Sequence, residues 1–148
     1  MDTLASLTVA DLLDKLASKS PAPGGGAVAG LVGAQAAALA RMVVSYSLGR
    51  TSLADHQTEL ESLAAQLDNA RGVMLSLADA DAQAYAGLSA LWKLPADDPK
   101  RQAEFLPAVR RAIQVPRSVM AAAADLLRLC ESLASISNTN LASDLVAA

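Results

Sequence analysis

The sequence predicts an all-helical protein, and its composition carries that prediction. Alanine supplies 33 and leucine 24 of the 148 residues, and both are strong helix formers. Aromatic residues make up only 3 % of the chain, although strands favour aromatic and β-branched side chains. A chain of this length suits a single domain with a buried core. We therefore expect one domain over residues 1–148, a bundle of about five helices that includes a long kinked helix.

The first expected helix covers about residues 9–18, because Thr8 is a typical N-cap and Asp11 follows it in capping-box register. A loop comes next, since Ser20-Pro21-Ala22-Pro23-Gly24-Gly25-Gly26 combines two prolines with three glycines. Its backbone amides lead into the N-terminus of the following helix, where a carboxylate or phosphate can bind. The alternative is that these glycines only let two backbones approach closely.

The second expected helix covers about residues 27–48 and ends before Gly49, which suits the C′ position. Small residues recur in it at spacings of three and four, which predicts close packing against a helix of this subunit or of a second one. They are Gly26, Gly30, Gly33, Ala34, Ala37 and Ala38. The helix is long enough to span a bilayer, but Gln35 and Arg41 lie within it, so a buried helix is the better interpretation.

A third helix is expected from Ser52, as its N-cap, to about Lys93, either unbroken or broken near Gly72 or at Asp79–Asp81. Its leucines and methionine recur at helical spacing and predict one apolar stripe.

A turn with Asp98 as N-cap opens the next helical region, Pro99–Ser135, in which Pro116 predicts a kink or a short break. A polar turn at residues 137–140 then precedes a last helix at residues 141–148. That helix stops without a glycine or a polar tail. We therefore expect that the chain lacks a C-terminal helical segment found in longer relatives; the alternative is a natural short end packed against a partner.

Charge and composition argue against several classes of protein. The net charge is −3 and no basic stripe is present, so a nucleic acid is not an expected partner. Cys130 is the only cysteine and is expected to be a small buried hydrophobe. His56 has no Cys or His at ligand spacing, so no metal site is expected. The chain starts without the apolar run of a signal peptide, and we expect a cytoplasmic protein that does not bind a membrane.

Two polar clusters besides the glycine-rich loop are candidates for chemistry. Asp79 and Asp81 diverge by about 200° around a helix, so one is expected to face a cleft and the other solvent, whereas Asp81 and Tyr85 share a face. The alternative is that both aspartates are surface charges. The second cluster is Asn138-x-Asn140-x-x-Ser143-Asp144. It either caps the last helix and compensates its dipole, or it places a buried Asp144 beside the asparagines as an acid or base with a shifted pKa.

Taken together, these clusters resemble the cyclodeaminase domain of formiminotransferase-cyclodeaminase and its stand-alone relatives, the bacterial methenyltetrahydrofolate cyclohydrolases. The matching segments cover essentially the whole chain in order and spacing. They are Ser20-Pro21-Ala22-Pro23-Gly24-Gly25-Gly26-Ala27-Val28-Ala29, Leu48-Gly49, Asp79-Ala80-Asp81-Ala82-x-Ala84-Tyr85, Val115-Pro116 and Asn138-x-Asn140-x-x-Ser143-Asp144.

The resemblance implies an all-helical homodimer that binds a tetrahydrofolate derivative near the glycine loop and the subunit interface, without a metal or redox cofactor. Either water adds to the methenyl carbon of methenyltetrahydrofolate, or a folate nitrogen attacks a formimino carbon and ammonia leaves; the sequence leaves both reactions open. By these roles Asp144 is the expected acid/base, with Asp81 or Asp79 as the second carboxylate. The expected substrate contacts are Ser20, Gly24, Gly25, Gly26, Arg41, Asn138, Asn140 and Ser143. The alternative function is a folate-binding or dimerisation module that has lost catalysis.

Overall fold

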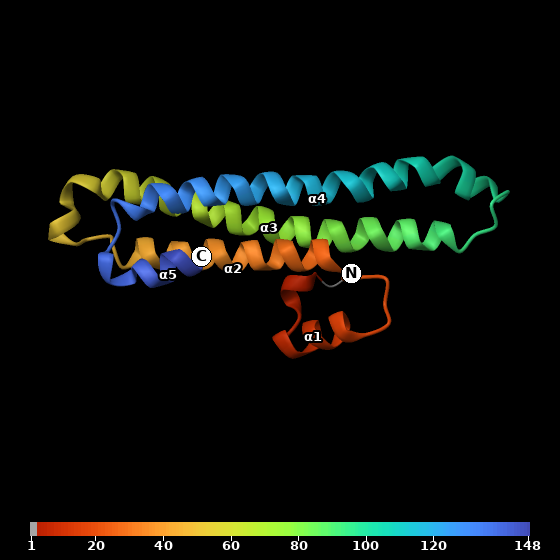
Figure 1. Cartoon of the computed structure of the whole chain (residues 1–148), viewed down its shortest axis with the longest axis horizontal. Coiled ribbons are helices and arrows are strands. Elements are labelled where there is room, and N and C mark those ends of the chain that lie inside the picture. The colour runs from red at the N-terminus through yellow and green to blue at the C-terminus, as the bar shows by residue number, and fades with distance from the viewer. Residues whose placement is uncertain (1–2) are drawn as a thin grey trace. The chain divides into compact units, whose positions relative to one another are not determined.

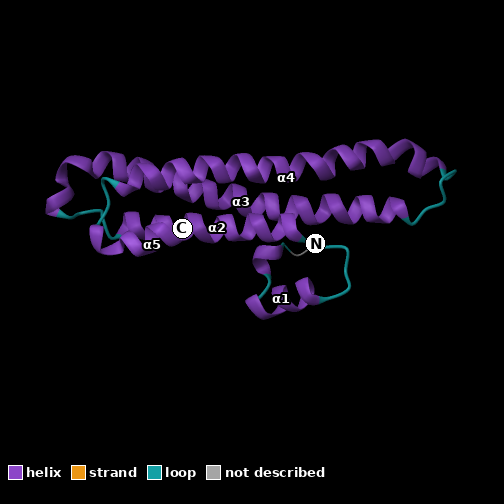
Figure 2. Ribbon diagram, viewed as in Figure 1, coloured by secondary structure: helices purple, strands orange, loops and turns teal. Residues whose placement is uncertain are grey.

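The computed structural model describes residues 3–148, and every regular element within them is helical (Figure 1; Figure 2). Short 3₁₀ turns precede three of the α-helices, at Leu4–Ser6, Thr51–His56 and Thr139–Leu141. The five α-helices are α1 (Val9–Ala17), α2 (Gly25–Ser45), α3 (Gln57–Trp92), α4 (Pro99–Ala134) and α5 (Ala142–Ala147). The predicted all-helical class with about five helices is confirmed.

The chain forms two compact units. The first unit joins the N-terminal part of the chain, through Leu31, to Leu75–Met120. The second unit joins Val32–Met74 to Ala121–Ala148. Helices α2, α3 and α4 therefore each contribute one part to each unit, and the candidate site residues are divided between the two.

Two of the predicted helix caps are confirmed. At the start of α1, the Thr8 hydroxyl oxygen accepts a hydrogen bond from the Asp11 N–H at 3.1 Å. At the start of α4, the Asp98 carboxylate accepts from the N–H groups of Lys100 and Arg101 at 2.9 and 3.1 Å. These side chains pair amides that have no acceptor inside the helix.

The start of α2 corrects the prediction for the glycine loop. The helix begins at Gly25 rather than near Ala27, and its first turn is closed by the Val28 N–H, which donates to the Gly24 carbonyl at 3.0 Å. Two of the three glycines are therefore helical. Glycine disfavours a helix by only about 1 kcal/mol relative to alanine, so packing of the first turn outweighs that preference.

The expected start of α3 at Ser52 is also wrong. Ser52 lies inside the 3₁₀ turn Thr51–His56, which has Arg50 at its N-cap position, and the α-helix begins at Gln57. The helix then continues unbroken to Trp92, through Gly72 and Asp79–Asp81. Its apolar stripe is buried, including Leu60, Leu67 and Met74, and tertiary packing of such a stripe supplies most helical stability in proteins. Likewise α4 continues through Pro116, so the expected break is absent there.

The core of the second unit combines small residues of α2 with leucines from α3 and α4. Its buried members include Ala37, Ala40, Leu60, Leu67, Leu126 and Leu133. A Cβ added to Gly33 of α2 would lie 2.8 Å from the Met74 Cε, which is closer than real Cβ contacts. At this point, the small residues of α2 therefore admit a side chain from α3 of the same chain.

Among the described helices, α2 alone is long and apolar enough to cross a membrane by length and composition, with a mean hydropathy of 1.7 over its most apolar window. Core helices of soluble proteins share these properties, and α2 supplies Ala37, Ala40 and Val44 to the core.

Candidate active site

A cavity at the N-terminus of α2 brings two of the predicted clusters together. It has a volume of about 380 Å³ and lies within the first unit. Its lining residues come from the loop and three helices, and they are Pro21, Gly24, Gly25, Gly26, Asp81, Tyr85, Ala112 and Pro116. The glycine loop and the Asp81–Tyr85 face of α3 thus border one space, although more than 50 residues separate them in the sequence.

The Asp81 carboxylate leaves no room for a side chain at Gly26. A Cβ added to Gly26 would lie 2.6 Å from Oδ2 of Asp81 and closer still to its Oδ1 and Cγ, whereas a Cβ on Gly24 or Gly25 would meet no atom within 4 Å. The close approach is therefore between a carboxylate and the first turn of α2. A helix N-terminus carries partial positive charge and stabilises a nearby anion. The chain itself places a carboxylate at this helix end.

Asp79 lies on a different side of α3. Its Oδ1 accepts a hydrogen bond from the Leu4 N–H at 2.7 Å, and it borders a larger cavity of about 770 Å³ together with Lys15, Ser20 and Gln83. Asp79 and Asp81 therefore diverge as the helical spacing predicts. Both carboxylates are half-buried, and each borders a cavity.

Ser20 belongs to the Asp79 cavity and not to the glycine cavity. Its hydroxyl donates to the Ala22 carbonyl at 2.7 Å, which orders the proline-containing part of the loop. Lys15 and Gln83 of this cavity were not predicted from the sequence. A single Lys or Gln on a helix is usually a solvated side chain, so its spacing alone gave no signal.

The Asn138 turn is anchored by Ser47, which was not predicted from the sequence. Ser47 is fully buried; its hydroxyl donates to the Val43 carbonyl at 2.7 Å and accepts from the Asn138 N–H at 2.9 Å. Asn138 Oδ1 accepts from the Asn140 N–H at 3.2 Å. Asn138 therefore caps the 3₁₀ turn Thr139–Leu141 rather than the last helix, because α5 has Leu141 at its N-cap position and no side-chain cap. The available signal for Ser47 was a polar residue shortly after the apolar end of α2, which closes at Ser45.

Asp144 is not buried, contrary to one of the two interpretations of its cluster. It is half-buried in the first turn of α5, a helix of six residues, and Ser143 and Asn140 beside it are exposed. Their expected roles stay predictions. Asp144 and this turn belong to the second unit.

Arg41 also belongs to the second unit, where charged and polar side chains already engage it. Its Nε lies 3.1 Å from Oδ2 of Asp68, and its guanidinium donates to the Ser45 hydroxyl at 2.5 Å. Substrate contact by Arg41 stays a prediction.

Cys130 is half-buried rather than fully buried and packs against the core of the second unit. Burial raises the pKa of its thiol, which lowers the thiolate fraction and the reactivity. In residues 3–148, no three His, Cys, Asp or Glu side chains are placed to hold a metal ion.

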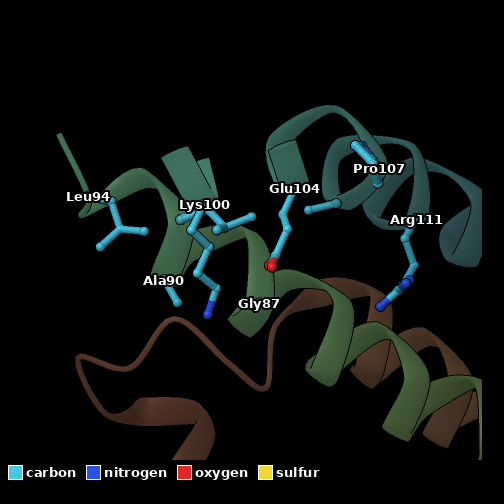
Figure 3. A pocket seen from close by; sticks show the side chains of 9 residues that line it. Gly87, Ala90, Leu94, Lys100, Glu104, Pro107 and Arg111 are labelled. Carbon is cyan, nitrogen blue, oxygen red and sulfur yellow. The ribbon is translucent and has the colours of Figure 1, made fainter. Parts of the chain in front are cut away.

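A further cavity, of about 490 Å³, lies between the end of α3 and the start of α4 (Figure 3). Its charged lining residues are Lys100, Glu104 and Arg111 of α4. They recur at spacings of four and seven and so share one helix face. Because Glu104 lies between the two cations along that face, this cavity is not a simple anion site.

Similarity to known proteins covers nearly the whole chain. A family model described as formiminotransferase-cyclodeaminase matches residues 8–148. A methenyltetrahydrofolate cyclohydrolase from Methylorubrum extorquens is 29 % identical over 141 residues, which are 93 % of this chain and 68 % of that protein. A formimidoyltransferase-cyclodeaminase from Rattus norvegicus is 33 % identical over 135 residues, which are 88 % of this chain and 25 % of that protein.

The fold is shared as well. The crystal structure of a formiminotetrahydrofolate cyclodeaminase from Thermotoga maritima matches with a TM-score of 0.87 and 32 % identity, covering 97 % of this chain and 69 % of that one. The present chain thus spans about two thirds of the bacterial relatives and a quarter of the rat protein. Because the family model matches all but the first seven residues, this chain belongs to the formiminotransferase-cyclodeaminase family.

Proposed function

We propose that this chain carries out acid/base chemistry on the one-carbon unit of a tetrahydrofolate, as a methenyltetrahydrofolate cyclohydrolase or a formiminotetrahydrofolate cyclodeaminase. The names of the relatives support the substrate class. The single observation that carries the proposal is the Asp81 carboxylate, held against the first turn of α2 at the glycine cavity.

Asp81 suits the charge of the reacting group. In methenyltetrahydrofolate the one-carbon unit is a carbon between two nitrogens that share a positive charge, and a protonated formimino group has the same pattern. A carboxylate beside that carbon stabilises the cation by Coulomb attraction, more strongly where water is partly excluded. An anionic substrate group at the same place would be repelled. Asp81 lies against the first turn of α2, and the same carboxylate meets the ligand.

The same carboxylate serves as the general base. In hydrolysis, Asp81 takes a proton from water as the water oxygen bonds to the methenyl carbon. The resulting hydroxyl group then loses its proton to water as the bond from the carbon to one folate nitrogen breaks. That nitrogen takes the proton held by Asp81, which leaves a formyl group and releases one proton overall. In deamination, a folate nitrogen bonds to the carbon of the protonated formimino group, and Asp81 takes the proton of that folate nitrogen. The bond from the carbon to the former imino nitrogen then breaks, and this nitrogen takes the proton from Asp81 and leaves as ammonia. Such proton transfer contributes about 10²- to 10⁴-fold in rate.

Matched aspartate variants test these roles. Replacing Asp81 with Asn should lower the kcat for methenyltetrahydrofolate decay by about 10²-fold or more. Asp79→Asn is the control, because it lies two residues away in the same helix and an amide oxygen can still accept from Leu4. Asp144→Asn tests the second proposed acid/base. Near-normal turnover in both Asp81→Asn and Asp144→Asn would remove both carboxylates from the mechanism.

The assay also separates the two reactions and the alternative function. Loss of methenyl absorbance above the buffer rate shows hydrolysis, whereas gain of that absorbance from formiminotetrahydrofolate, with release of ammonia, shows deamination. Folate binding to the wild-type chain without either reaction would support a binding module and contradict catalysis.

We also propose that the chain self-associates. Leu106, Ile113 and Met120 follow one another at seven-residue intervals on α4 and are 57 %, 56 % and 72 % exposed. Seven residues are close to two helical turns, so these side chains share a face. We infer that these exposed apolar side chains on one helix face belong to an interface between copies of the chain.

A further inference from the structure

Three of the four aromatic residues of the chain gather in one row in the first unit. The ring centroids of Tyr85 and Trp92, both on α3, are 6.3 Å apart with an interplanar angle of 74°. The Trp92 centroid is 6.2 Å from that of Phe105 on α4, at 59°. Tyr85 and Trp92 are 44 % and 48 % exposed. Because the Tyr85 and Trp92 rings meet edge to face and the Trp92 and Phe105 rings are tilted, part of their flat surface stays open to a ligand.

Arg101 ends the row with a positive charge. Its guanidinium lies 5.6 Å from the Phe105 ring centroid, and it donates to the Leu94 carbonyl at 2.7 Å. No ion pair engages Arg101 within residues 3–148. The ring contact and the hydrogen bond fix the plane of the guanidinium, and its other N–H donors are available for a carboxylate, which arginine binds in a bidentate manner.

The row continues from the glycine cavity. Asp81, Tyr85 and Trp92 are spaced by four and seven residues and so share one face of α3. On α4 the corresponding residues, read toward its N-terminus, are spaced by four, seven and four positions. They are Pro116, Ala112, Phe105 and Arg101. Tyr85 lines the cavity and also contacts Trp92. From Asp81 to Trp92 the helix advances about 16 Å.

We propose that the row of Tyr85, Trp92, Phe105 and Arg101 binds the aminobenzoyl-glutamate half of the folate. This inference rests on the proposed function for the position of the one-carbon unit beside Asp81. In a tetrahydrofolate, a benzoyl ring follows the one-carbon unit after a single nitrogen, and the glutamyl carboxylates follow after one amide. The benzoyl ring then packs on the open faces of Tyr85 and Trp92, and a carboxylate binds Arg101.

The charged cavity of Figure 3 is a poorer place for the carboxylates. Its Glu104 would repel them, and the cavity lacks an aromatic side chain among its lining residues. The aromatic row has both features that the ligand requires, flat apolar surface and an unpaired cation.

The fragment p-aminobenzoyl-glutamate is the probe, because it binds without any turnover. Trp92 is the only tryptophan, so a change in intrinsic emission on titration reports this position alone. Calorimetry then measures affinity in the variants. We expect Arg101→Gln to weaken the fragment about tenfold or more, as expected for a hydrogen bond to a charged group. Trp92→Ala should weaken it about fivefold, the magnitude of one aromatic contact.

Two control variants and one wild-type measurement accompany these. Arg110→Gln removes an exposed cation elsewhere on α4, and Tyr46→Ala removes an exposed aromatic residue of the second unit; both should leave affinity unchanged. Circular dichroism checks the fold of each variant. If Arg101→Gln unfolds, the wild-type chain still decides: p-aminobenzamide, which lacks the glutamate, should bind about tenfold more weakly than the fragment.

The outcomes separate this inference from the proposed function. Fragment binding that depends on Arg101, in a chain without turnover, supports the binding row and contradicts the catalytic proposal. Turnover with a silent Trp92 and an unchanged KM in Arg101→Gln overturns the inference and leaves the catalytic proposal intact. Trp92 emission that follows protein concentration instead of fragment concentration would show that a second copy covers the row, and would also overturn it.

Discussion

The contact between Asp81 and Gly26 predicts that one added methyl group at Gly26 displaces the proposed base. A Cβ at Gly26 would lie 2.6 Å from Oδ2 of Asp81, whereas ordinary van der Waals contact begins at 3.4 Å. The carboxylate must therefore retreat by at least about 0.8 Å. A misplacement of about 1 Å can cost about 10²-fold in rate, so we expect Gly26→Ala to lower kcat by about that factor.

Gly25→Ala is the matched control. It introduces the same methyl group one residue earlier in the same helical turn, where an added Cβ meets no atom within 4 Å. Both variants gain the helix preference of alanine, which stabilises by about 0.4–1 kcal/mol where the backbone permits it. Gly25→Ala should keep more activity than Gly26→Ala and gain stability, and Gly26→Ala should gain less stability because it must move Asp81.

A double variant isolates the contact. Combining Gly26→Ala with Asp81→Ala removes the clash, so the two changes should be non-additive in urea unfolding, with a coupling energy of about 0.5–3 kcal/mol. Activity should not return, because the base is gone. The assays are methenyltetrahydrofolate decay and urea denaturation followed by circular dichroism. Equal kcat in Gly26→Ala and Gly25→Ala would refute the reasoning that the position of Asp81 over α2 matters for turnover.

Three further measurements follow from the described contacts. Ser47→Ala leaves the buried Asn138 N–H without its acceptor and should cost about 1–3 kcal/mol in the free energy of unfolding, while Ser132→Ala, exposed on α4, should cost little; equal melting temperatures would contradict the anchor. Cys130 should react with iodoacetamide more slowly than free cysteine, because burial raises the pKa of its thiol above its ordinary value. As the pH rises, the thiol of the unfolded chain ionises before that of the folded chain. The folded state therefore keeps its full stability below the pKa of the unfolded thiol and loses stability as the pH rises toward the raised pKa of the folded thiol. Alkylation at the rate of free cysteine would refute the burial of the thiol. Ile113→Glu should shift the sedimentation of the chain toward the monomer, and a monomeric wild-type chain at micromolar concentration would contradict self-association.

Local features of the sequence determined the helices and two of their caps. The helix-forming composition and the apolar spacing of α3 predicted the class, and Thr8 and Asp98 predicted their helix starts. These predictions succeeded because hydrogen bonds within a turn and helical side-chain spacing involve residues only three or four apart. The predicted helix starts were wrong in two places. At Gly25 the packing of the first turn outweighed the local preference of glycine, and at Ser52 a 3₁₀ turn precedes the α-helix.

The pairs that build the candidate sites were decided by the tertiary structure. The sequence marked the glycine loop and Asp81 separately, but their contact depends on the rotation of α3 about its axis and its register along α2. The same holds for Ser47 beneath Asn138 and for Trp92 between Tyr85 and Phe105. Rotation and register follow from burying all the apolar stripes together, and no short segment of sequence contains that information.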